Sequence, residues 1–308
     1  GGVGTTVLKL LGGLAARDDL KLLDIAEDRR KDPKARAELM NQADVVFLCL
    51  PDAAAREAVA LVKSERTVII DTSTAHRVAP GWAYGFAELS REHRSRIQGA
   101  KRIANPGCHA TGFIAAAYPL VKLGIAGRDY PFSCHSITGY SGGGKKMIAQ
   151  YEDGGRPTAY DSPRQYGLNL RHKHLPEMQR VVGLDEPPLF NPVVADFYSG
   201  MAVTVPLQAR LLQKRLTLSQ LVRELSAFYG GRALISVREA PEDGFLPANL
   251  LQGKDSLRLY VTGNDEQINL VSVFDNLGKG ASGAAVQNMN LALGVQETKS
   301  LRLGEDFS

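Results

Sequence analysis

The chain has 308 residues, of which 44% are hydrophobic and 23% charged, and 37 Lys and Arg against 33 Asp and Glu leave a net charge of +4. This composition excludes a disordered or collagen-like protein, and the length predicts about two domains. The basic residues form no stripe, so neither nucleic acid nor a membrane surface is an expected partner. The longest apolar runs, residues 45–50 and 113–121, are shorter than the ~20 residues of a membrane span.

Elements in the first third of the chain alternate between strand and helix patterns. The glycine-rich turn GGVGTT (residues 1–6) leads into a helix from Val7; such a turn normally follows a strand, which is expected before Gly1. Strands are then predicted at residues 20–25, 44–50 and 67–71, and helices at 33–41, 53–63 and 88–96. The strand at 44–50 is almost continuously apolar, which is typical of a parallel strand buried on both faces. These alternating strands and helices predict a Rossmann-type parallel sheet.

Beyond residue 105 the pattern changes to longer strands with few crossovers. After a helix at 110–123, strands are predicted at 131–138, 200–209, 233–239 and 267–274, with a helix at 219–229. This order favours an α+β domain with a mostly antiparallel sheet. A helix of small residues follows at 278–294. We expect a dinucleotide-binding domain at 1–107, completed by 280–308, and a catalytic and oligomerisation domain at 108–279.

The glycine-rich start is the first candidate site. Glycines before a helix let the backbone approach a pyrophosphate, whose charge the helix N-terminus then stabilises. Gly1, Gly4, Thr5 and Thr6 are therefore candidate cofactor residues. An ordinary tight turn is the alternative.

Cofactor choice depends on the end of the predicted strand at 20–25. An acidic residue there binds the ribose hydroxyl of NAD, whereas arginine accommodates the 2′-phosphate of NADP. Glu27 and Asp28 precede Arg29 and Arg30, and we favour NADP, bound by the two arginines. A solvated charged turn is the alternative.

Cys108 is the strongest catalytic candidate. Pro106 and Gly107 break the chain immediately before it, and a helix is predicted to begin at or just after Cys108. A helix N-terminus stabilises a thiolate, and its free N–H groups hold a developing oxyanion. Cys49 and Cys134 lie within predicted strands, where a buried, unreactive cysteine is the usual case. Three cysteines at wide spacing indicate neither a disulfide framework nor a metal site, so we expect a reducing, cytoplasmic setting and no metal ion.

A nucleophilic cysteine requires a proton carrier. His174 precedes a helix that starts near Pro176, from which its side chain can reach a cleft, and it is the candidate acid/base. His109 is the weaker candidate because neighbouring helical side chains point about 100° apart.

Two segments and Asn105 offer groups for an anionic substrate or the cofactor. Ser73 and Arg77 follow the strand at 67–71, at the sheet edge where ligands bind. The loop YSGGGK (residues 140–145) offers backbone donors and a lysine. Ser141 and Gly142 are assigned to the cofactor, and Lys145, with Asn105, to the substrate. A flexible surface loop is the alternative reading for residues 140–145.

Several collinear motifs resemble one enzyme family, the N-acetyl-γ-glutamyl-phosphate reductases, in particular their shorter class. The motif NPGCHATG (residues 105–112) carries the resemblance most clearly. Others are GGVGTT, LLDIAEDRRKD, FLCLPD, DTSTAHR, GYSGGGKKM, HKHLPEM, FNPVVADFYSGMAVTVPL and DNLGKGASGAAVQNMN. The chain departs from the family at His109, where tyrosine or phenylalanine is common.

The resemblance implies a fold shared with aspartate-semialdehyde and glyceraldehyde-3-phosphate dehydrogenases. It implies an NADPH-dependent acyl-phosphate reductase of arginine biosynthesis, with Cys108 forming a thioester and His174 acting as acid/base. Ser73 and Arg77 would bind the departing phosphate, and Asn288 would contact the nicotinamide. A homo-oligomer, either a dimer or a tetramer, is expected.

Three alternatives stay open. One is a sibling acyl-phosphate or semialdehyde dehydrogenase with another amino-acid substrate. The second is a cysteine acyltransferase or hydrolase that keeps a degenerate nucleotide domain, and the third is a non-catalytic nucleotide-sensing module.

Overall fold

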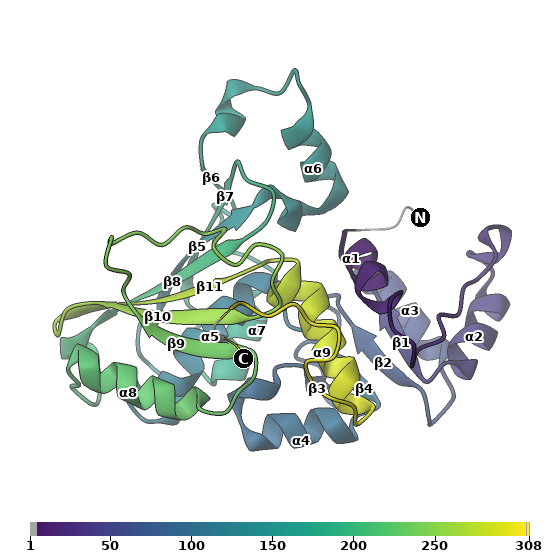
Figure 1. Cartoon of the computed structure of the whole chain (residues 1–308), viewed down its shortest axis with the longest axis horizontal. Coiled ribbons are helices and arrows are strands. Elements are labelled where there is room, and N and C mark those ends of the chain that lie inside the picture. The colour runs from purple at the N-terminus through teal and green to yellow at the C-terminus, as the bar shows by residue number, and fades with distance from the viewer. Residues whose placement is uncertain (1–4, 306, 308) are drawn as a thin grey trace. The chain divides into compact units, whose positions relative to one another are not determined.

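The computed structural model describes residues 5–305 and 307, with side chains from Lys9 onward (Figure 1). Two compact units make up the chain: Gly1–Gly107 with Ala281–Leu301, and Cys108–Gly280 with Arg302–Ser308. The sequence reading assigned 280–308 to the first unit. In the structure Arg302 instead joins the second, since its N–H donates to Asp255 Oδ2 and its carbonyl accepts from the Asp255 N–H.

The first unit contains a parallel sheet with strand order β1-β2-β4-β3. Its strands are β1 (Val45–Leu48), β2 (Val68–Asp71), β3 (Ala83–Tyr84) and β4 (Arg102–Ala104). Its helices are α1 (Thr5–Leu14), α2 (Pro33–Gln42), α3 (Asp52–Leu61), α4 (Arg91–Gly99) and α9 (Gly283–Ala292), with short 3-10 turns η1 (Glu27–Arg29) and η2 (Ala87–Leu89).

Helices cover both faces of this sheet, and neighbouring side chains of β2 pack against different helices. Ile70 packs in one cluster with side chains of α1, α4 and α9, whereas Ile69 packs in another with Ala58 of α3. Successive residues of a strand point to opposite faces, so a strand buried on both sides needs apolar residues throughout. Figure 1 shows α9, in yellow, among the blue elements of this unit.

The prediction of a strand at residues 20–25 is wrong, because this segment has no regular structure. A strand requires a neighbour for its ladder of hydrogen bonds, and none of the described strands pairs with it. Leu22 and Leu23 are 47% and 41% exposed. The helix predicted at 88–96 is interrupted at Ser90, whose hydroxyl accepts from the His93 N–H and so begins α4.

The second unit contains a mixed sheet with strand order β6-β7-β5-β8-β11-β10-β9. The strands are β5 (Ser133–Gly139), β6 (Arg164–Gln165), β7 (Leu189–Ala195), β8 (Met201–Gln208), β9 (Ile235–Glu239), β10 (Leu257–Gly263) and β11 (Gln267–Phe274). The β5–β7 and β9–β10 pairs are parallel, and the other neighbouring pairs are antiparallel. The predicted fold class is thereby confirmed, although β6, β7 and β10 were not foreseen.

Helix α5 (Cys108–Lys122) is packed closely on the sheet of this unit. A Cβ added at Gly112 would lie 2.5 Å from Val203 Cγ2 on β8 and 2.9 Å from Phe274 Cε1 on β11. Only glycine allows this approach. The remaining helices are α6 (Gly144–Glu152), α7 (Leu175–Val182) and α8 (Leu218–Tyr229), with the 3-10 turns η3 (Tyr140–Gly143), η4 (Thr158–Asp161) and η5 (Ala209–Leu211) and the π-turn η6 (Gly278–Ser282).

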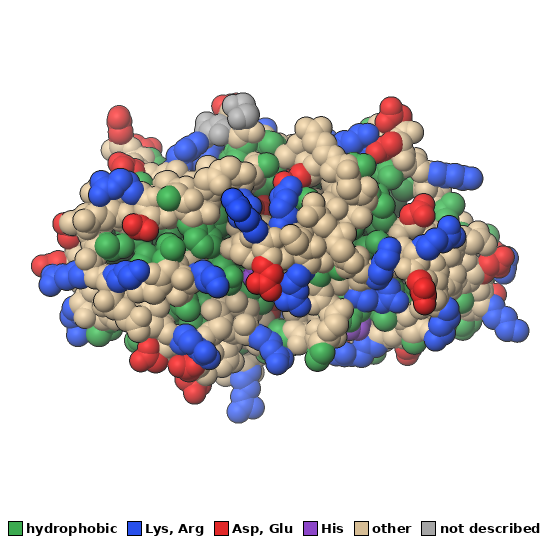
Figure 2. Space-filling view, turned by 90° about the horizontal axis from the view of Figure 1, so that it is seen from below, with side chains coloured by type: hydrophobic (Ala, Val, Ile, Leu, Met, Phe, Trp, Pro, Cys, Tyr) green, Lys and Arg blue, Asp and Glu red, His purple; other side chains and the backbone are tan. Residues whose placement is uncertain are grey.

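Within the described residues, every helix is too short or too polar to traverse a lipid bilayer. The face in Figure 2 carries Lys and Arg side chains interspersed with Asp and Glu.

Candidate functional site

Cys108 is the first residue of α5, as the sequence predicts, and its side chain is partly exposed. The first turn of the helix contains no acidic residue, so nothing there opposes stabilisation of a thiolate by the helix N-terminus. Gly280 lies against this residue: a Cβ added there would be 3.0 Å from Cβ of Cys108. The glycine therefore leaves room for the cysteine side chain.

The other two cysteines are poor nucleophiles. Burial raises the pKa of the Cys49 thiol and that of the Cys134 thiol, and a neutral thiol reacts far more slowly than a thiolate. Cys108 is the remaining candidate.

His109 is held between two hydroxyl groups. Its Nδ1 lies 2.6 Å from Ser136 Oγ on β5, and its Nε2 lies 2.7 Å from the hydroxyl of Tyr166. Burial, more than the nearby positive charges, lowers the pKa of His109 to about 3. The imidazole is therefore neutral, and both of its nitrogens are already hydrogen-bonded.

His174 lies at the N-terminus of α7 and is buried. Its ring centroid is 5.5 Å from that of His109 and 4.9 Å from that of His172. His174 therefore lies beside His109, the second residue of α5, which Cys108 begins. Among the described residues no group of His, Cys, Asp and Glu is arranged to hold a metal ion.

Sequence reasoning missed the partners of His109 and His174. Tyr166 follows β6, and its hydroxyl contacts His109. Burial raises the pKa of Tyr166 first, and the charge of Cys108 raises it further. His172 accepts from the His174 N–H through Nδ1 at 3.3 Å. The sequence signal for such partners was His109 itself, because an imidazole that is buried requires polar groups to bond with.

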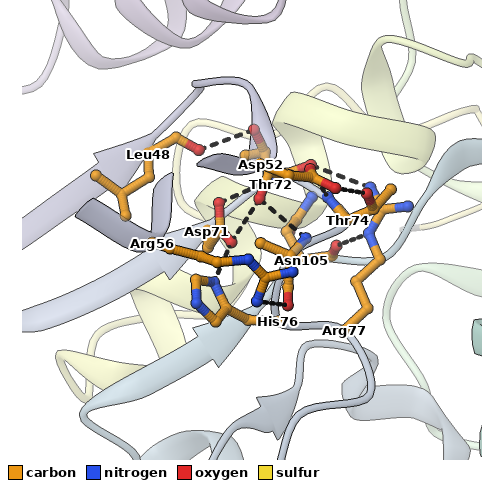
Figure 3. A network of polar contacts seen from close by, with 11 residues as sticks. Leu48, Asp52, Arg56, Asp71, Thr72, Thr74, His76, Arg77 and Asn105 are labelled. Carbon is orange, nitrogen blue, oxygen red and sulfur yellow. Dashed lines mark hydrogen bonds and ion pairs between the residues drawn. The ribbon is translucent and has the colours of Figure 1, made fainter. Parts of the chain in front are cut away.

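The loop after β2 is organised by Asp71 (Figure 3). This fully buried carboxylate accepts from the Ser73 N–H and hydroxyl and lies 2.6 Å from His76 Nδ1. The Ser73 hydroxyl also accepts from the Ala75 N–H at 3.2 Å. The carboxylate thus fixes the backbone that leads to Arg77.

Arg77 binds backbone carbonyl groups. Its Nε donates to the Asn105 carbonyl at 3.1 Å and its Nη2 to the Thr72 carbonyl at 3.0 Å (Figure 3). Arg56 braces the same loop through the Ala75 carbonyl at 3.1 Å. The guanidinium of Arg77 is therefore held at the carboxyl edge of β2.

Asn105 and Asn288 meet in the first unit, and both are buried. Asn105 Nδ2 donates to the Ala281 carbonyl, and Asn288 Nδ2 donates to Asn105 Oδ1 and to the Gly85 carbonyl. Asn288 Oδ1 has no hydrogen-bond partner among the described residues. It can accept a hydrogen bond from a ligand.

The remaining predicted cofactor residues are dispersed. Gly1 and Gly4 lie outside the described residues, as do the side chains of Thr5 and Thr6, whose backbone begins α1. Arg29 and Arg30 lie at η1, exposed, with loose ion pairs of 3.8 Å to Asp32 and 3.7 Å to Glu27.

The loop at residues 140–145 belongs to the second unit. The buried Ser141 accepts from Asn276 Nδ2 through Oγ, and its N–H donates to the Tyr198 carbonyl. Gly142 and Lys145 are exposed. The triple glycine forms the end of η3 and the start of α6.

Family models match both halves of the chain. The NAD-binding domain of semialdehyde dehydrogenases matches residues 12–97, and their dimerisation domain matches 108–276. Among solved structures, aspartate semialdehyde dehydrogenase II from Vibrio cholerae aligns over 96% of each chain with a TM-score of 0.71 and 17% identity. The enzyme from Francisella tularensis aligns over 94% of this chain and 96% of its own, with a TM-score of 0.69 and 11% identity. These define the class, an oxidoreductase of the semialdehyde dehydrogenase group with a nicotinamide cofactor.

Curated relatives identify the family within this class. The N-acetyl-gamma-glutamyl-phosphate reductases of Brucella ovis and Brucella canis are each 48% identical over 298 residues, covering 94% of this chain and 96% of theirs. The chain belongs to the N-acetyl-gamma-glutamyl-phosphate reductase family, which confirms the resemblance read from its motifs.

Proposed function

We propose that the chain reduces N-acetyl-glutamyl 5-phosphate to N-acetyl-glutamate 5-semialdehyde and phosphate, with NADPH, in arginine biosynthesis. The observation that carries this proposal is Cys108 at the N-terminus of α5, where the next residue, His109, lies beside His174. The names of the relatives that are 48% identical supply the substrate.

Each step uses a residue of this chain. The Cys108 thiolate attacks the acyl carbon while N–H groups at the start of α5 hold the oxyanion, and the C–O bond to phosphate breaks to leave a thioester. The bound nicotinamide cofactor supplies a hydride for this thioester. His174 donates a proton to the oxygen of the thiohemiacetal and takes it back when the C–S bond breaks, which releases the aldehyde and restores the thiolate.

Arg77 is the proposed ligand of the phosphate group, because a guanidinium forms paired hydrogen bonds with phosphate oxygens. Ser73 donates its hydroxyl proton to Asp71, so we propose that it shapes the loop that presents Arg77. Asn105 would hold the Arg77 guanidinium through its carbonyl. Lys145, exposed in the first turn of α6, is the proposed contact for a carboxylate of the substrate.

The residues of the first unit fit a nicotinamide dinucleotide. The orphaned Oδ1 of Asn288 is buried and accepts hydrogen bonds only, which suits the amide N–H group of a nicotinamide. Arg29 and Arg30 are exposed and loosely paired, which leaves them able to bind a 2′-phosphate, so we propose NADP over NAD. Gly1, Gly4, Thr5 and Thr6 would hold the pyrophosphate. In the second unit, Ser141 and Gly142 are the remaining proposed contacts of the cofactor.

The test is the reverse reaction with purified protein. Oxidation of N-acetyl-glutamate semialdehyde should require NADP and inorganic phosphate together, with NAD much less effective. Activity with aspartate semialdehyde but not with the acetylated substrate would favour the sibling dehydrogenase. Release of the acid without NADP would favour the hydrolase, and absence of turnover with both semialdehydes would contradict the proposal.

The second unit supports a proposal on assembly. Residues 108–276 match a dimerisation domain, so we propose a homo-oligomer, a dimer or a tetramer, formed through the catalytic domain, with the first unit as the dinucleotide-binding domain. Light scattering on the purified protein gives the molar mass. The molar mass of a monomer at micromolar protein concentration would contradict the proposed homo-oligomer. We also propose a cytoplasmic location, because a reducing compartment keeps a cysteine as a free thiol.

A further inference from the structure

His172 forms the turn that leads into α7. Its Nδ1 accepts from the His174 N–H at 3.3 Å, and its carbonyl accepts from the Leu175 N–H at 3.0 Å. The first N–H groups of a helix have no partner within the helix. Pro176, in the first turn of α7, has no N–H group to satisfy. His172 therefore provides acceptors for two N–H groups at the point where the chain enters α7.

Aromatic rings from several segments hold the imidazole of His172 in place. Its centroid is 5.1 Å from that of Phe190 on β7 and 5.6 Å from that of His109 on α5, both edge to face. The Tyr166 ring lies 6.0 Å away, also edge to face, and the His174 ring lies 4.9 Å away, tilted by 50°. Edge-to-face pairs at these separations are favourable, so the packing keeps Nδ1 turned toward the His174 N–H.

The hydrogen bond from the His174 N–H requires a lone pair on Nδ1 of His172. Burial, more than the charge of Lys173, lowers the pKa of His172 to about 4. The ring is therefore neutral near pH 7, and because Nδ1 accepts, its one proton is carried by Nε2. A protonated ring would have no acceptor to offer the turn.

We propose that His172 is a positioning residue for His174, and that it fixes the backbone of His174 through the hydrogen bond from the His174 N–H to its own ring. The inference rests on the proposed function, in which His174 carries the proton. A proton carrier must lie within hydrogen-bond reach of the reacting atom, and a misplacement of about 1 Å is sufficient to slow a reaction by about 10²-fold. A turn that holds the backbone of the carrier prevents this loss.

The first test separates the acceptor of His172 from its ring. His172→Phe keeps an aromatic ring without an acceptor, whereas His172→Asn loses the ring and keeps an oxygen that accepts from the N–H two residues ahead. His172→Phe should lower turnover about three- to tenfold, the usual worth of one hydrogen bond. The Michaelis constants for phosphate and NADP should change little, and His172→Asn should keep more turnover than His172→Phe. Wild-type turnover in His172→Phe would overturn the inference.

Asn169 provides a matched control in the same segment. Its Oδ1 accepts from the Arg171 N–H at 3.2 Å, also two residues ahead, at an exposed position. Asn169→Ala removes this bond and should leave turnover unchanged. In a protein that already carries His174→Asn, His172→Phe should lower turnover no further, because a residue that acts through His174 has no effect once His174 is replaced. Losses that multiply in the double variant, or an equal loss in Asn169→Ala, would contradict a positioning role.

Hydrogen exchange tests the turn independently of turnover. Exchange of the His174 backbone amide, followed by mass spectrometry, should be faster in His172→Phe than in the wild type and close to the wild type in His172→Asn. Unchanged exchange in His172→Phe would refute the inference, even if the wild-type protein reduces its substrate normally. If the wild-type protein has no reductase turnover but exchange is faster in His172→Phe, only the proposed function is contradicted.

Discussion

The side-chain amide of Asn288 donates to Oδ1 of Asn105 at 3.0 Å, although the two residues are 183 positions apart. Asn105 in turn donates to the Ala281 carbonyl, so the segment that returns to the first unit is fastened at the end of β4. Two residues, Pro106 and Gly107, then separate Asn105 from Cys108 along the chain. The asparagine pair therefore fixes the backbone at the end of β4 within the first unit.

Cys108 is expected to be indispensable. Cys108→Ser should abolish turnover and remove the selective alkylation site, because a serine hydroxyl stays protonated where the thiol ionises. Cys49→Ser is the control: burial raises the pKa of the Cys49 thiol, so activity should persist. Steady-state rates and mass spectrometry of the alkylated protein give both readouts. Near-normal turnover by Cys108→Ser would eliminate the thioester mechanism.

His174 is expected to carry the proton. His174→Asn should lower turnover by roughly 10²–10⁴-fold, the usual contribution of a placed general acid or base, while NADPH still binds in a fluorescence titration. His93→Asn, which changes a histidine that caps α4 with Ser90, is the control and should keep its rate. If His109→Asn loses the rate and His174→Asn does not, the wrong histidine has been assigned.

Arg77 is expected to act on phosphate. Arg77→Lys keeps the charge but loses the planar fork, so the Michaelis constant for phosphate should rise about tenfold and that for NADP should change little. Arg56→Lys changes an arginine that also braces this loop through a carbonyl. It should leave the Michaelis constant for phosphate unchanged. If Arg77 only braces the loop, both constants should shift together and the melting temperature should fall. Reverse-direction kinetics and thermal unfolding distinguish these outcomes.

Acid should destabilise the second unit through its buried histidines. Burial lowers the pKa of His109 to about 3 and that of His172 to about 4, below the ordinary value near 6.5. Between these values the unfolded chain binds more protons, so the free energy of unfolding falls as the pH falls below about 6.5. His109 alone contributes up to about 1.4 kcal/mol per pH unit.

Urea unfolding at pH 7, 6, 5 and 4 measures this dependence. His109→Phe removes one proton site and should flatten the slope, whereas His135→Gln, at an exposed histidine of β5, should not. An identical slope in His109→Phe and the wild type would show that His109 is not the group responsible.

Local patterns determined much of the architecture. Apolar runs with helix-period segments between them predicted β1 and β2 with α2 and α3, and Pro106-Gly107 predicted the start of α5 at Cys108. These signals lie within a few residues of one another, and short-range rules of turn and helix formation are sufficient to interpret them. Strand β7 escaped notice because it contains Pro192, and a proline within an apolar run normally argues against a strand.

The sequence by itself determined the family, the fold class and the position of Cys108, the predicted nucleophile, at a helix start. Only the tertiary structure decided what those residues contact: Arg77 on backbone carbonyls, Asn288 on Asn105, and His109 between Ser136 and Tyr166, 27 and 57 positions away. Tertiary structure also decided that residues 20–25 form no strand. The physical reason is that secondary structure follows from neighbouring residues, whereas hydrogen-bond partners and strand ladders depend on which distant segments packing brings together.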